Sequence, residues 1–74
     1  MTDDNERKVL ELMADGQERT IRMVEDEILG PPADPGIIEV DRLALCFAVY
    51  RLGVDGDLAK RKDGQGRTFY RWAA

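Results

Sequence analysis

Five basic side chains within the last seventeen residues are the most concentrated chemical feature of this sequence. The first 57 residues carry fourteen acidic and six basic side chains, a net charge of −8, whereas residues 58–74 carry a net charge of +4. Cationic side chains bind phosphates, and such asymmetry is typical of chains that contact nucleic acid or an acidic partner. Lysine and arginine also protect an exposed strand from aggregation, so both interpretations stay open. The cations are Lys60, Arg61, Lys62, Arg67 and Arg71, with Asp63 as the only acid among them.

This chain contains few of the residue types that enzymes commonly use for catalysis. It has no histidine and no serine, so the usual general base and a serine nucleophile are absent. Cys46 is the single cysteine and lies in an apolar stretch without a neighbouring cation, which predicts a buried, inert thiol. The segment from Gly64 to Gly66 is a turn and lacks the rest of a phosphate-binding loop. We therefore expect no enzyme, no metal site and no cofactor.

The length and composition predict one small domain over residues 1–74. The chain is 43% hydrophobic and 35% charged. A domain of this size has a marginal core, so self-association or a partner is the expected support. No apolar run approaches the roughly 20 residues of a membrane span, and the N-terminus is acidic where a signal peptide would be basic. The expected location is the cytoplasm.

Helical periodicity and turn residues predict three helices followed by a β-hairpin. Asp3 and Glu6 have the spacing of a capping box, and Gly16 is suited to end the first helix. Thr20 is suited either to a short extended piece or to capping the second helix. The three prolines lie in a rigid loop over residues 30–36. The predicted helices cover about 4–15, 21–29 and 39–53, and the predicted hairpin covers about 58–73.

Two boundaries stay open in this prediction. Either Gly53 or Gly56 ends the third helix. The hairpin has two possible registers. A two-residue turn at Asp63–Gly64 places Leu58 opposite Phe69, whereas a three-residue loop at Gly64–Gly66 places Leu58 opposite Trp72.

The third helix carries apolar residues on two sides. One stripe is predicted to face the core, and it consists of Val40, Leu43, Ala44, Phe47 and Tyr50. The second stripe consists of Leu45, Val49 and Leu52, on roughly the opposite side. In so short a chain this second stripe is a candidate surface for a partner or a second copy. The alternative is that the hairpin packs over it.

The order of these elements resembles the winged helix-turn-helix family of prokaryotic regulators. The resemblance rests on three segments: the apolar stripe at Val9–Met13 closed by Asp15–Gly16, the run from Val54 to Leu58 that leads into the basic residues at 60–62, and the aromatic strand at Arg67–Trp72. It implies a small α+β winged-helix domain. In that family the third helix lies in the DNA major groove and the wing touches the backbone or the minor groove.

This sequence departs from the family pattern before and within the third helix. The preceding connection is longer and richer in proline than the usual tight turn. The helix itself offers only Arg42 and Arg51 to bases, while Glu39 and Asp41 would repel phosphates. We therefore expect the basic wing to carry the phosphate contacts, with Arg42 as a sixth candidate. Phe69, Tyr70 and Trp72 are expected to pack rather than to stack on bases.

Two functions follow from the sequence as hypotheses. The first is a DNA-binding or transcription-regulatory module, acting as a homodimer or beside a protein partner on double-stranded DNA. The second is a protein-interaction or dimerisation module on the same fold, which uses Leu45, Val49 and Leu52 and has no affinity for DNA.

Overall fold

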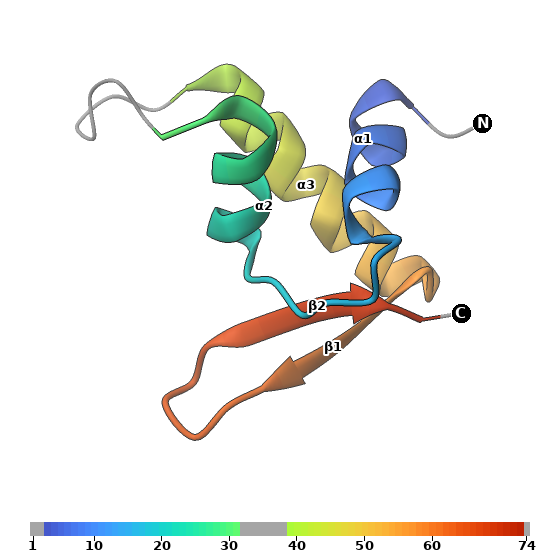
Figure 1. The fold of residues 1–74 in the computed structure, drawn as a ribbon, viewed down its shortest axis with the longest axis vertical. Helices are drawn as coiled ribbons and strands as arrows, with labels where there is room; N and C mark the ends of the chain where they lie inside the picture. The colour runs from blue at the N-terminus through green and yellow to red at the C-terminus, as the bar shows by residue number, and fades with distance from the viewer. Residues whose placement is uncertain (1–2, 32–38, 74) are drawn as a thin grey trace.

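The computed structural model describes residues 3–31 and 39–73. Three helices precede a two-stranded antiparallel sheet, which is the small α+β, winged-helix-like layout that the sequence predicts. Helix α3 runs behind α1 and α2, and the hairpin lies below all three (Figure 1). The elements are α1 (Asp4–Met13), α2 (Ile21–Leu29), α3 (Val40–Asp55), β1 (Leu58–Lys62) and β2 (Thr68–Trp72).

The first two helices begin at capping residues. The backbone N–H of Glu6 donates to the Asp3 carboxylate at 2.8 Å, and α1 ends at Met13, two residues before the predicted end. The backbone N–H of Met23 donates to the Thr20 hydroxyl at 3.2 Å, and α2 has the predicted bounds. Gly30, with φ +81°, follows α2. Most of the predicted proline-rich loop, residues 32–36, lies outside the described residues.

Helix α3 continues through Gly53 and ends at Gly56. The carbonyl of Leu52 accepts the N–H groups of both Gly56 and Asp57, and Gly56 takes the left-handed conformation with φ +93°. At Gly53, a Cβ atom would lie 3.0 Å from the ring of Tyr70. Gly53 is thus the point at which the hairpin approaches α3, and Gly56 is the point at which the chain turns into β1.

Replacing Gly56 with alanine is expected to lower the free energy of unfolding by about 1–2 kcal/mol, because a side chain strains the left-handed conformation. Gly64→Ala is the matched control, since Gly64 has no positive φ and no atom lies within 4 Å of the position that its new methyl group would take. Urea denaturation of both variants measures the difference. Equal stabilities would contradict this account of the end of α3.

The hairpin adopts the register in which Leu58 lies opposite Trp72. The Asp63 carboxylate accepts the backbone N–H groups of Gln65 at 2.8 Å and Arg67 at 2.9 Å, which organises the loop. Hydrogen bonding by the Arg67 backbone N–H lowers the pKa of Asp63. Arg19 and Tyr70 exchange two backbone hydrogen bonds of 2.8 Å, so the segment between α1 and α2 pairs with the free edge of β2.

The core lies between the three helices and one face of the hairpin. Helix α3 contributes Leu45, Ala48, Val49 and Leu52, which are at most 2% exposed. Leu58 and Tyr70 from the hairpin belong to the same cluster, with Val9, Met13 and Val24 from α1 and α2. None of the helices in the described part of the chain has the length and apolar character needed to cross a membrane.

This core reverses the predicted orientation of α3. Leu45, Val49 and Leu52 are buried within the single chain and are not available to a partner. The hairpin covers them only in part, because α1 and α2 also pack against α3. The stripe that periodicity assigns to the core lies largely on the outside. Periodicity reveals two apolar stripes, but only the packing of the other elements decides which one is covered.

Candidate functional site

The most exposed apolar surface of the described residues lies on α3. We call it the α3 outer face. Its side chains are between 46% and 79% exposed, although they are large and apolar. An amphipathic helix in a small domain normally turns polar residues to water, so this face is unusual. Its members are Val40, Leu43, Phe47, Tyr50 and Val54.

The α3 outer face has the residue spacing of a coiled-coil seam. Its members follow one another at intervals of three, four, three and four residues. At roughly 100° per residue this spacing forms one narrow stripe. The buried residues Leu45 and Leu52 lie on the other side of the helix. The outer face is therefore exposed on the surface of the domain and accessible to a binding partner.

Arg42, a predicted contact to nucleic acid, is instead an internal brace. Its side chain is only 13% exposed. Its guanidinium donates to Asp26 at 2.8 Å and to Glu39 at 3.3 Å, and it also donates to the carbonyl of Gly30. Hydrogen bonding to Asp26 is the main cause that raises the pKa of Arg42. The charge of Arg42 thus links α2 to α3 and is compensated within the domain.

Arg51, the other arginine of α3, is also paired. It donates to Asp3 at 2.8 Å and to Glu6 at 2.9 Å, both at the start of α1. The two cations of α3 therefore tie this helix to its neighbours. The α3 outer face, which is apolar, offers few groups that match the donors and acceptors of base edges.

Two of the wing arginines surround Phe69. Arg61 donates to Glu18 at 2.8 Å and lies 5.1 Å from the centre of the Phe69 ring. Arg67 donates to Asp63 at 2.8 Å and lies 5.7 Å from the same ring centre. Hydrogen bonding to Arg61 lowers the pKa of Glu18. These contacts hold the wing together and neutralise part of its charge.

The remaining wing cations divide between the two sides of the hairpin. Lys60, Lys62 and Arg71 are exposed and form no ion pair within the described residues. Side chains alternate along a strand, so Lys60 and Lys62 share a face with buried Leu58, while Arg71 shares the other face with Arg61. The five basic residues thus do not gather on a single surface.

The wing aromatics pack as predicted. Tyr70 is buried against Gly53, and this burial raises its pKa. Trp72 is half-buried against the core and lines a shallow apolar hollow with Leu10. Phe69 is half-buried beneath its two arginines.

Cys46 is half-buried rather than fully buried. Burial is the main cause that raises the pKa of its thiol, and the nearby charge of Glu25 adds to this effect. A raised pKa disfavours the reactive thiolate. Among the described residues, no group of three or more acidic or cysteine side chains is arranged to hold a metal ion.

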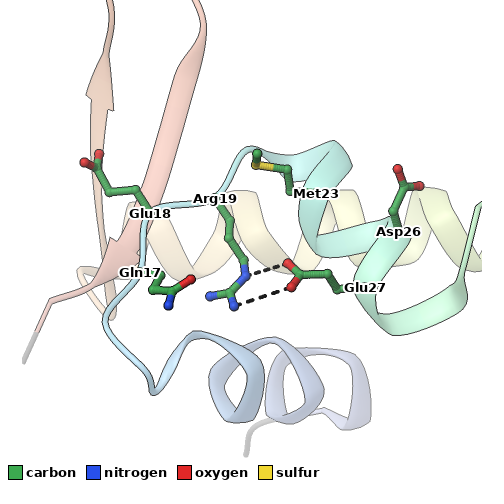
Figure 2. A pocket seen from close by; sticks show the side chains of 6 residues that line it. All are labelled: Gln17, Glu18, Arg19, Met23, Asp26 and Glu27. Atoms are coloured by element: carbon green, nitrogen blue, oxygen red, sulfur yellow. Dashed lines mark hydrogen bonds and ion pairs between the residues drawn. The ribbon is translucent and has the colours of Figure 1, made fainter.

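A buried arginine that sequence reasoning missed joins α1 to α2. Arg19 is 7% exposed, and Figure 2 shows its side chain reaching from the extended segment to Glu27 of α2. Its other nitrogen atoms donate to the Asp15 carboxylate at 2.9 and 2.8 Å. An open hollow of about 310 Å³ lies beside this cluster. The polar groups of Arg19 are already satisfied, so the cluster is a structural joint.

The Arg19 joint is expected to make stability depend on pH in acid. Hydrogen bonds from Arg19 are the main cause that lowers the pKa of Asp15 from 3.8 to about 2. A carboxyl group with a lowered pKa stabilises the fold above its unfolded pKa, and this contribution is lost as the pH falls toward 2. The stability difference between the parent and Asp15→Asn should therefore shrink as the pH falls from about 4 to about 2. Urea denaturation across this range measures it, and a constant difference would contradict the assignment.

Comparison with protein-family models, with curated proteins and with solved structures found no match to this chain. Its function is therefore inferred from the geometry described above.

Proposed function

We propose that this domain is a protein-interaction module that binds through the α3 outer face. The observation that carries this proposal is the exposure of five large apolar side chains in a coiled-coil spacing on one helix. Covering apolar surface is the main favourable term in most protein association. The winged-helix-like scaffold is compatible with this role because a fold does not determine a function.

The size of the α3 outer face agrees with an interface. Aromatic side chains such as Phe47 and Tyr50 bury about 150–250 Å² each when fully covered. Together with the three smaller aliphatic members, the half-exposed face offers on the order of 500 Å². This is close to a tenth of the 5106 Å² surface of the domain. One partner in a typical interface contributes a similar share of its surface. The α3 outer face is therefore large enough to bind one helix of a partner.

The charges of α3 favour a protein over DNA at this surface. Arg42 and Arg51 are held by carboxylates of the same domain. Asp41 and Asp55 lie near the two ends of the helix and are exposed. Carboxylates at these positions would repel phosphates in a major groove.

Replacing Phe47 with lysine tests the proposed function. The matched control is Met23→Lys, because Met23 lies on α2 and is 48% exposed against 55% for Phe47. We expect the parent and Met23→Lys to bind a protein partner, either a second copy or another chain, that Phe47→Lys loses. Affinity capture and solution mass, measured on all three chains, provide the comparison. The same partners and the same mass for all three would contradict the proposal.

A second candidate function, contact of the wing with the DNA backbone, is favoured by Lys60, Lys62 and Arg71, which form no ion pair among the described residues. Each phosphate contact contributes a slope of about −0.9 to a plot of log affinity against log salt concentration. Replacing all three with alanine should flatten this slope by up to about 3, while Lys8→Ala with Arg22→Ala is the control on the helices. Fluorescence anisotropy with mixed-sequence duplex DNA measures it. Equal affinities for parent and triple variant would remove this candidate.

A further inference from the structure

We infer that the partner of the α3 outer face is a second copy of this chain, with the two α3 helices packed antiparallel. The inference rests on the proposed function and names the occupant of that surface. It follows from the spacing of the exposed residues, from their self-complementary pairing and from the area that two copies would bury.

The outer face is complementary to itself when two α3 helices run in opposite directions. One antiparallel register places Phe47 opposite Tyr50 of the second copy. The same register places Leu43 opposite Val54 of the second copy. A twofold axis repeats each contact, so four layers of apolar side chains form from these four residues. The three-four spacing lets side chains of one helix fit between those of the other.

The residues beside the seam permit the close approach of a second helix. Ala44 and Cys46 flank the outer face, and both are small and only partly buried in the single chain. The long Arg51 side chain is drawn away toward Asp3 and Glu6 of its own α1. Within α3, no bulky charged group therefore stands over the centre of the seam near Phe47.

The area is sufficient for a specific but weak dimer. Two copies would together bury roughly 1,000 Å², just below the range of about 1,200–2,000 Å² for stable interfaces. The core of the contact would be aromatic, with two Phe47–Tyr50 pairs, and aromatic pairs strengthen a contact beyond what their area provides. We therefore expect a dimer that dissociates on dilution.

The charge of the chain makes a distinctive prediction for this dimer. Each copy carries a net charge of −4. Two copies of the same net charge repel each other, so like charges oppose association. Salt screens this repulsion, and the dimer should become stronger as the salt concentration rises. Binding to DNA would show the opposite dependence on salt.

Sedimentation equilibrium of the full chain, over a range of protein and salt concentrations, tests the inference. We expect the parent and Met23→Lys to shift from monomer to dimer as either concentration rises. Phe47→Lys should stay monomeric while its circular dichroism and melting temperature show that it is folded. A parent that stays monomeric throughout, or a dimer that survives in Phe47→Lys, would overturn the inference.

Mixing two variants tests the antiparallel direction. Leu43→Lys and Val54→Glu should each weaken the dimer when alone. Mixed in equal amounts they should form a heterodimer, because the antiparallel register places the new lysine beside the new glutamate and leaves the other Leu43–Val54 pair intact. A parallel pair would set position 43 against position 43 and position 54 against position 54, so it would form no lysine–glutamate pair. A mixture that dimerises no more tightly at low salt than at high salt would show that this pair is missing and would overturn the proposed packing.

The two proposals fail in different ways. A monomeric parent that still captures another protein through Phe47 would remove the second copy as partner and leave the interaction module in place. A monomeric parent that captures no protein through Phe47 would remove both.

Discussion

Val49→Lys is expected to unfold the domain, whereas Phe47→Lys, the same change two residues earlier on α3, is expected to leave it folded. Val49 is fully buried between the helices, and Phe47 is 55% exposed. Burying an unpaired ammonium group costs several kcal/mol, and losing a buried valine costs about 1.5–3 kcal/mol more. A domain of this size has a total stability of only about 4–11 kcal/mol.

Far-ultraviolet circular dichroism and urea denaturation of the two variants measure this contrast. Because the substitution is identical, the comparison separates the two sides of α3 from any general effect of lysine in a helix. If Val49→Lys folded normally and Phe47→Lys did not, the orientation of α3 would be the one that periodicity alone suggests. If both folded equally well, the assigned core would be wrong.

Replacing Arg19 with methionine is expected to lower the free energy of unfolding by about 2–3 kcal/mol. Removing one partner of a buried ion pair typically costs about 3–5 kcal/mol. The expected loss is smaller because Asp15 and Glu27 are 41% and 45% exposed, so water can solvate both carboxylates after the change. Methionine preserves most of the apolar packing of the arginine stem.

Arg22→Met is the control for this prediction, since Arg22 is exposed on the same helix that Glu27 occupies. Denaturation measures the stability of both variants, and an NMR titration follows Asp15. In Arg19→Met the pKa of Asp15 should return from about 2 toward its ordinary value of 3.8, because the hydrogen bonds from Arg19 are lost. Equal stability of the two variants, with an unchanged Asp15 pKa, would show that Arg19 is not a joint.

Local signals predict the helices and the hairpin well. Thr20 begins α2 and Gly56 ends α3 through contacts within a few residues. The capping and turn preferences of single residue types report such contacts directly. The choice between two glycines or two registers needs the structure, because each alternative satisfies the same local preferences.

The candidate site is less predictable because long-range pairing decides it. The sequence shows that Arg42 and Arg61 are cations, but not that Asp26 and Glu18 neutralise them from elsewhere in the chain. Periodicity identifies both apolar stripes of α3 but assigns the exposed stripe to the core and the buried stripe to a partner. Arg19 stands in a short polar segment without any pattern, so no local signal marks it as buried.

The pairing of Arg19 with Tyr70 also affects how the domain folds. Two backbone hydrogen bonds join segments about 50 residues apart, and the same tyrosine packs against Gly53 of α3. Closing so long a loop costs entropy before any contact is gained, and distant pairings slow folding. A nascent chain synthesised only through α3 therefore lacks the strand that closes the core. The aliphatic core residues of its helices stay partly uncovered until β2 has left the ribosome.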